Sequence, residues 1–167
     1  MKRFRKWMET AYGNKGLSLV EILVVVAIMS IMVGGASVSV SLAYSRDAEK
    51  CAKTIDTAME NARMLSLSEK GTFTLEVDMV GNKLYIHSSE SAVPVLEEDL
   101  QKRVSIYVPG QASVNNVTVQ FDKSTGKVVN MTGEDNGILR ITSENNTRKK
   151  ATVVLVKGTG KHYVEYK

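Results

Sequence analysis

Residues 15–45 read KGLSLVEILVVVAIMSIMVGGASVSVSLAYS. The stretch begins with a Lys-Gly pair, places an acid at Glu21, and then continues over residues 22–45 for 24 residues without a charge. A helix rises about 1.5 Å per residue, so this run can cross the ~30 Å hydrocarbon core of a bilayer once. We therefore predict that residues 17–44 form an apolar helix that anchors the chain in a membrane.

Residues 45–70 continue the helical pattern with a single apolar face. Small and apolar residues recur at spacings of three and four, as in a helix that packs on a core. This face comprises Ala48, Cys51, Ala52, Ile55, Ala58, Met59, Ala62 and Leu65. Because no proline or turn cluster separates the two halves, we predict one helix of about fifty residues.

Charge is unevenly placed along the chain. Residues 1–16 hold five Lys or Arg and one acid, so the formal net charge of +4 belongs to this leader and the remainder is neutral. Within the remainder, residues 17–137 carry 10 bases and 15 acids, whereas residues 138–167 carry 7 and 2. This balance argues against a globally basic nucleic-acid-binding protein, and any basic patch should be local and C-terminal.

A basic leader before an apolar run admits two interpretations. In the first, the segment is a secretory signal peptide that is cut after Ala43, where Ser41-Leu42-Ala43 supplies small residues, and a β-rich domain is released. In the second, the helix is retained. The uncharged run is longer than the ~7–15 apolar residues of a usual signal peptide, and the helical pattern continues past Ala43, so the second interpretation is favoured.

The sequence from Lys15 to Glu21 resembles the prepilin signal of type IV pilins and type II secretion pseudopilins. The resemblance implies that a prepilin peptidase cuts between Gly16 and Leu17 and that Leu17 is then N-methylated. It also implies that Glu21 pairs with the terminal amino group of a neighbouring subunit and sets the register of a filament. Ser18-x-x-Glu21 also has the form of a helix capping box, which is compatible with that role.

Residues 71–167 change to alternating apolar and polar positions, which predicts a β-rich globular domain. We expect strands over residues 73–79, 84–86, 104–108, 117–121, 127–131, 138–142, 151–157 and 161–166. Residues 88–102 form an acidic connection, with a short helix expected near residues 97–102. A long helix packed against an antiparallel sheet places the chain in the α+β class.

The order of these elements resembles the GspH/FimT-like minor pseudopilins and minor pilins. The resemblance rests on Asn61-Ala62-Arg63, on a strand and turn from Val119 to Gly126, and on a closing hairpin over residues 151–166 with Gly158 and Gly160 at its turn. It implies a single-pass subunit of the bacterial cytoplasmic membrane, with its globular domain outside the cytoplasm. Such a subunit joins other pilin subunits in an extracytoplasmic filament for secretion, a pilus or competence.

No set of residues predicts catalysis, a cofactor or a metal site. Cys51 is the only cysteine, which excludes an intramolecular disulfide and Cys-ligated zinc. His87 and His162 fall in different expected strands without an acidic partner at ligand spacing, so we expect exposed histidines. Residues 123–127 lack the phosphate-loop pattern, and residues 134–137 have the composition of a turn. The chain is therefore interpreted as non-enzymatic.

The C-terminal bases form the remaining candidate site. They are Arg140, Arg148, Lys149, Lys150, Lys157 and Lys161. One interpretation is a solvated or docking face for the acidic residues 97–99 of another subunit. The alternative is a surface that contacts DNA during uptake or an exported protein, since phosphate contact needs only clustered Lys and Arg.

Overall fold

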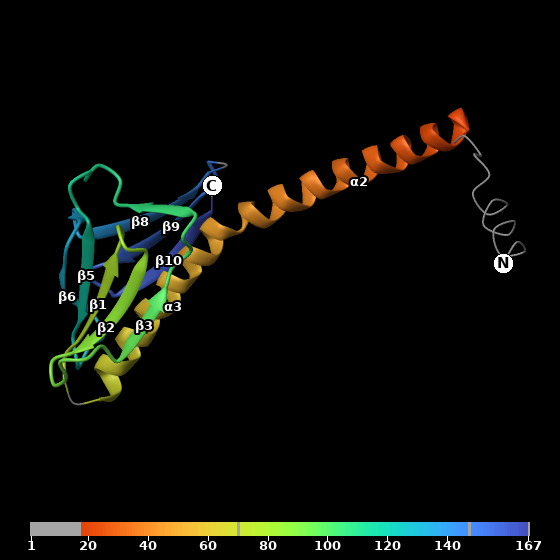
Figure 1. Ribbon diagram of the computed structural model, residues 1–167. Helices are drawn as coiled ribbons and strands as arrows, with labels where there is room; N and C mark the ends of the chain where they lie inside the picture. Colours follow the sequence, from red (N-terminus) through yellow and green to blue (C-terminus); the bar gives the residue numbers. More distant parts are fainter. Residues whose placement is uncertain (1–17, 70, 147, 167) are drawn as a thin grey trace, which may run out of the picture. The chain divides into compact units, whose positions relative to one another are not determined.

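The chain is described by a computed structural model that covers residues 18–69, 71–146 and 148–166, with the backbone alone for residues 35–45. Its contacts divide it into two compact units, one that ends at Ser41 and one that begins at Leu42. Helix α2 (Leu19–Ser45) runs past this division, and its residues up to Ser41 belong to the first unit. Helix α3 (Asp47–Ser68) and the ten strands found among the described residues lie in the second unit (Figure 1).

Helix α2 carries no charged residue after Glu21. All described side chains of the helix, over residues 19–34, are exposed, and the helix continues through Gly34 and Gly35 without interruption. Among the described residues, no helix has both the length and the apolar character that a membrane crossing requires. The predicted crossing over residues 17–44 is therefore not confirmed by the structure.

The prediction of one continuous helix is wrong at Arg46. Helix α3 (Asp47–Ser68) follows α2 after this single residue, whose φ of −88° and ψ of −11° lie in the right-handed helical region. The break falls where the uncharged run meets the first charges of the amphipathic segment. No glycine or proline lies at this break, so the sequence pattern did not indicate a helix boundary at Arg46.

Two antiparallel sheets form the rest of the second unit (Figure 1). The first has the order β3-β2-β1-β5-β6, and the second has the order β10-β9-β8-β4 with β7 paired to β8. The strands are β1 (Phe73–Asp78), β2 (Lys83–Ser88), β3 (Leu96–Asp99), β4 (Val104–Tyr107), β5 (Asn116–Phe121), β6 (Val128–Met131), β7 (Glu134–Asp135), β8 (Ile138–Asn145), β9 (Lys150–Val156) and β10 (Lys161–Tyr166).

Strand β3 replaces the short helix expected near residues 97–102. It pairs with β2, Leu84 lying opposite Glu98, and Lys83 Nζ lies 2.6 Å from Glu97 Oε1. The open edge of β2 offers backbone partners and a lysine to this acidic segment. These tertiary partners outweigh the local helical preference of the sequence.

Helix α3 covers both sheets with the apolar face expected from the sequence. It packs on β1 of the first sheet and on β8, β9 and β10 of the second. Seven of the eight predicted face residues are buried, while Leu65 is only partly buried. Ser66 is buried as well, and its hydroxyl donates to the Ala62 carbonyl at 2.8 Å. The expected α+β class, with a helix on antiparallel sheet, is confirmed.

Candidate functional site

Helix α2 begins with a capping box. The Ser18 backbone N–H donates to Glu21 Oε2 at 3.2 Å, and the Val20 N–H donates to Ser18 Oγ at 3.4 Å. These bonds satisfy amide groups that the first helical turn leaves without partners. Gly16 and Leu17, the predicted cleavage and methylation positions, lie outside the described residues.

The turn between β5 and β6 is organised by one carboxylate oxygen. Asp122 Oδ1 accepts from the hydroxyls of Ser124 at 2.8 Å and Thr125 at 2.7 Å, and from the backbone N–H groups of both residues. The hydrogen bonds from Thr125 and Ser124 lower the pKa of Asp122 to about 2. This turn is the Asp-to-Gly turn that the sequence resemblance singled out.

Three sequence features of that resemblance meet at Gly126. The Arg63 guanidinium Nε of α3 donates to the Gly126 carbonyl at 3.1 Å. A Cβ at Gly160, in the β9–β10 turn, would collide with the same carbonyl oxygen. The glycine lets the two turns approach closely, so α3, the β5–β6 turn and the closing hairpin share one contact.

The structure separates the C-terminal bases into two groups. Lys150 begins β9 and Lys157 follows its last residue, so seven residues of strand, about 23 Å, separate them. Lys150 pairs with Glu144 at 3.2 Å and Lys157 pairs with Glu134 at 2.8 Å. Arg140 lies in the middle of β8, opposite Val154, and Lys161 begins β10 beside the β9–β10 turn.

Other bases, which sequence reasoning missed, join the group around Arg148. Lys50 and Lys53 line a groove with Gln101, and Lys102 and Arg103 line another with Asn146. Lys102 and Arg103 lie near Asn146 because Val104, at the start of β4, pairs with Asn145 at the end of β8. We call this surface the basic end: Arg46, Lys50, Lys53, Lys102, Arg103, Arg148, Lys149 and Lys150.

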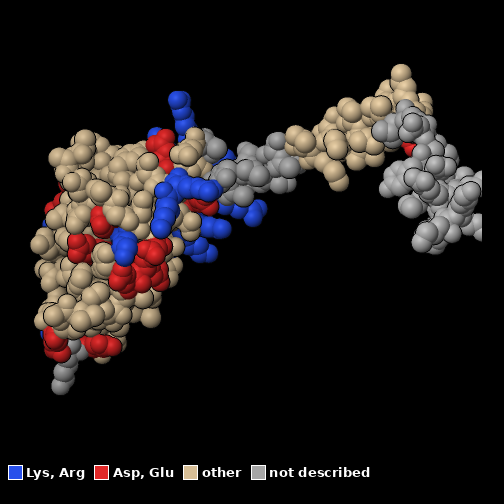
Figure 2. Space-filling model, viewed as in Figure 1, with Lys and Arg blue, Asp and Glu red and all other residues tan. Residues whose placement is uncertain are grey.

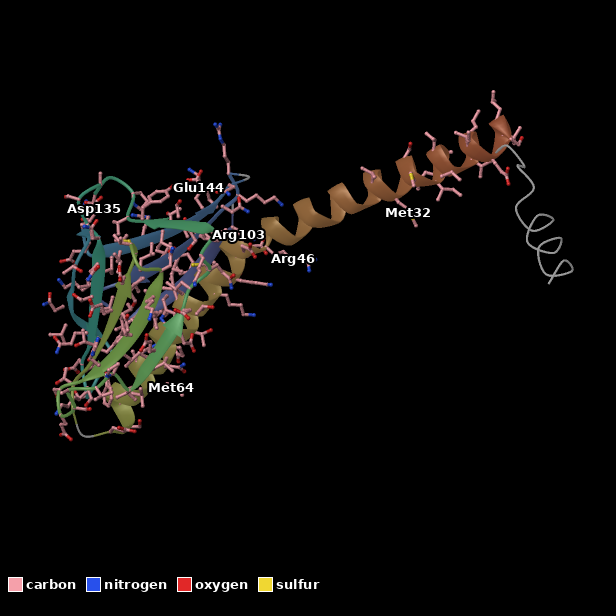
Figure 3. All side chains as sticks on the ribbon, in the orientation of Figure 1. Met32, Arg46, Met64, Arg103, Asp135 and Glu144 are labelled. Atoms are coloured by element: carbon pink, nitrogen blue, oxygen red, sulfur yellow. The ribbon has the colours of Figure 1, made fainter. Side chains whose placement is uncertain are left out.

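Figure 2 shows the basic side chains gathered where α3 begins, with acidic side chains beside them. In Figure 3, Arg46, Arg103 and Glu144 lie toward this end of the second unit, whereas Met64 lies near the other end of α3. The bases come from three separate parts of the chain, so no local count of charges could have identified the surface.

His162 is not the exposed histidine that the sequence predicted. Its side chain is 8% exposed, and its Nε2 lies 3.4 Å from Glu60 Oε2 and 3.8 Å from Asp56 Oδ1 of α3. His87 is more exposed, and its Nε2 lies 3.4 Å from Glu76 Oε2. Both histidines therefore have an acidic partner from another element, which spacing along the sequence could not indicate.

The weaker sequence motifs have structural roles. Asn136 and Gly137 both have positive φ and connect β7 to β8 as a two-residue hairpin turn, as expected for an Asn-Gly pair. Residues 123–127 belong to the β5–β6 turn. Within the part of the chain that the structure describes, no group of three or more His, Cys, Asp or Glu side chains is placed to hold a metal ion.

Known proteins resemble the chain in an N-terminal sequence motif and in fold. The prokaryotic N-terminal methylation motif matches residues 12–37. The type IV minor pilin FimU of Pseudomonas aeruginosa is similar in structure, with 17% identity, a TM-score of 0.52, and coverage of 70% of this chain and 91% of FimU. In a second crystal form, FimU gives 16% identity, a TM-score of 0.54, and coverage of 72% and 89%.

A minor pseudopilin has a similar fold. The minor pseudopilin EpsH from the type 2 secretion system of Vibrio cholerae shows 8% identity and a TM-score of 0.50, with coverage of 72% of this chain and 97% of EpsH. No curated protein matches the chain significantly in sequence. The chain thus combines the prokaryotic N-terminal methylation motif with a fold similar to those of the minor pilin FimU and the minor pseudopilin EpsH.

Proposed function

We propose that the chain is a structural subunit of a type IV pilus-like or type II secretion-like filament, processed by a prepilin peptidase after Gly16. The methylation motif over residues 12–37, joined to this fold, is the observation that carries the proposal. Residues 17–44 hold the subunit in the bacterial cytoplasmic membrane with the globular domain outside. Other pilin or pseudopilin subunits are its partners in the filament, whether the machine serves secretion, a pilus or competence.

The capping geometry supports a processing site just before α2. The described helix begins at Leu19, after Ser18, so it starts two residues beyond the proposed scissile bond between Gly16 and Leu17. By contrast, Ala43 lies within helix α2. Proteolytic sites concentrate in exposed non-helical segments, so release of the domain by cleavage after Ala43 is the weaker alternative.

Mass spectrometry of the chain purified from membranes tests the proposal directly. We expect the mature N-terminus at Leu17, with the mass of one added methyl group. A mature N-terminus at Tyr44, with the protein in the soluble fraction, would show instead that a signal peptidase releases the domain.

Two substitutions separate the two roles of Glu21. Gln at this position keeps a side-chain oxygen for the Ser18 N–H but removes the charge, whereas Ala removes both. If Glu21 sets filament register through a charged partner, Glu21→Gln and Glu21→Ala are both processed normally and both fail to enter filaments. Normal incorporation of Glu21→Gln would show that the charge is not required, and failure of Glu21→Ala alone would show that the capping oxygen is what filament entry needs.

DNA capture remains the alternative main task of the same architecture. It would use Arg148 and Lys149, which are exposed in the β8–β9 turn. Substitution of both by glutamate should then abolish retention of duplex DNA by the protein. Unchanged retention, measured by mobility shift at low salt, contradicts this alternative.

A further inference from the structure

The basic end lies at the start of α3, next in sequence to the end of the uncharged run. Arg46 is the first charged residue after the uncharged run, which ends at Ser45. Lys50 and Lys53 lie four and seven residues further along the chain, about 6 Å and 10 Å along a helix. If residues up to 44 lie in the bilayer, Arg46 and Lys50 lie within about one Debye length of its surface along the helix, and Lys53 lies slightly beyond it.

The other bases of this end come to the same place through tertiary contacts. The buried thiol of Cys51, next to Lys50, faces Ser143 of β8 and the backbone of Gln101. Gln101 precedes Lys102 and Arg103, and Ser143 lies in the strand that leads to the β8–β9 turn with Arg148 and Lys149. The start of α3 therefore lies beside both of these basic segments.

Most bases of the basic end make no ion pair within the described residues of the second unit. Within the described residues, none of Lys50, Lys53, Lys102, Arg148 and Lys149 makes an ion pair, whereas Lys150 pairs with Glu144. The acids at this end are Asp47 and Glu49 of the first turn of α3, Glu98, which lines the groove of Lys50 and Lys53, and Glu144, which pairs with Lys150 and also interacts electrostatically with Arg148. Bases are in excess, so the surface is available to an external anion.

We infer that the basic end binds the anionic phospholipid headgroups of the membrane that holds the apolar helix, and so seats the second unit on the bilayer before the subunit enters a filament. This inference rests on the proposed membrane anchoring. The chemistry is phosphate recognition by clustered ammonium and guanidinium groups, each of which is attracted to an anionic membrane surface. DNA and the acidic strand β3 of a second copy are also anionic. The membrane is favoured because the proposed anchor is covalently continuous with the basic end through Arg46, so the chain itself would hold this surface beside the bilayer.

The test uses the full chain in lipid nanodiscs and measures how fast each lysine reacts with an amine reagent, by mass spectrometry. One set of discs contains phosphatidylcholine, and the other includes about 30% phosphatidylglycerol. We expect Lys50, Lys53 and Lys149 to react about threefold or more slowly in the anionic discs, and roughly 0.5 M NaCl to remove the difference. Lys127 and Lys161, near the other end of β9, should react equally in both discs.

Variants provide a second readout at an unaltered residue. The double variant Lys50→Gln, Lys53→Gln should lose most of the protection of Lys149 in anionic discs. The matched variant Lys127→Gln, Lys161→Gln removes the same charge from the other end and should keep that protection. Protection of Lys149 that is the same in both variants would contradict the inference.

Each remaining outcome has a distinct meaning. Equal lysine reactivity in both discs, with the chain co-eluting with the discs, overturns the lipid site and leaves the anchor intact. A chain that does not co-elute with discs refutes the anchor and therefore both proposals. Protection in neutral discs that needs added duplex DNA, or that grows with the number of copies per disc, assigns the surface to DNA or to a second copy and overturns the membrane proposal.

Discussion

Single side chains hold the turns of this protein in place. Asp122 Oδ1 accepts four hydrogen bonds from Ser124 and Thr125, and the Gly126 carbonyl accepts from Arg63. Each of these bonds satisfies a polar group in a segment without sheet partners. The turn is thereby held in one conformation against α3.

The carboxylate of Asp122 should make stability depend on pH in the acid range. Its pKa of about 2 in the folded chain lies below the ordinary value, so its contribution is present above about pH 4 and is lost as the pH falls through 2. We expect Asp122→Ala to lower the melting temperature at pH 6, with the difference from the wild type narrowing between pH 4 and pH 2.

The double variant Ser124→Ala, Thr125→Ala tests the cause of this effect. It removes the two hydroxyl donors and leaves the carboxylate, so it should also lower the melting temperature at pH 6. A melting temperature equal to that of the wild type would show that the hydroxyls do not stabilise the turn.

Gly160 and Gly158 form a matched pair in the β9–β10 turn. Gly160 has a φ of +66° and no room for a Cβ beside the Gly126 carbonyl, whereas a Cβ at Gly158 meets nothing within 4 Å. We expect Gly160→Ala to lower the free energy of unfolding by about 2–4 kcal/mol and Gly158→Ala by less than about 0.5 kcal/mol. Denaturant titration measures both, and equal losses would contradict the close approach of the two turns.

At the scale of elements, α3 depends on side-chain size along its buried face. Four of the buried positions are alanines, which let the helix axis approach both sheets. Ile55 is the largest of the fully buried side chains that α3 contributes, followed by Met59, and it is 0% exposed. The buried face of α3 contacts both sheets, so the helix holds the two sheets together.

Truncation of Ile55 should be far more costly than truncation of an exposed residue on the same helix. We expect Ile55→Ala to lower the free energy of unfolding by about 2–5 kcal/mol, because it leaves a cavity between α3 and the sheets. Met64→Ala, at a side chain that is 56% exposed, should cost less than about 1 kcal/mol. Similar losses in the two variants, measured by denaturant titration, would contradict the packing described for α3.

For the whole molecule, Cys51 provides a reporter of global unfolding. It is 0% exposed, and burial raises the pKa of its thiol, while Ser143 and the Gln101 backbone partly offset that effect. We expect Cys51 to react with iodoacetamide at pH 8 at least about a hundredfold more slowly in the folded than in the unfolded chain. The control variant Cys51→Ala, Thr57→Cys carries an exposed thiol on the same helix and should react rapidly. Rapid reaction of native Cys51, or slow reaction of the thiol at position 57, would contradict the assigned burial.

The distribution of charge also becomes clear only for the whole molecule. The sequence predicted a basic C-terminal segment, but strands β8, β9 and β10 are antiparallel and carry its bases to two separate ends. The group at Arg148 gains Lys50, Lys53, Lys102 and Arg103 from earlier in the chain. A charge count along the sequence therefore identified the right residues only in part.

Local patterns determined the elements. The uncharged run, the spacing of the α3 face and the alternation after residue 71 predicted the helices, most strands and the α+β class, because periodicity reflects burial on one side of an element. Tertiary structure alone decided the pairing of β3 with β2, the burial of the His162 side chain of β10 against α3, and the assembly of the basic end. Each of these depends on partners distant in sequence, whose contacts outweigh local preference and leave no periodic trace.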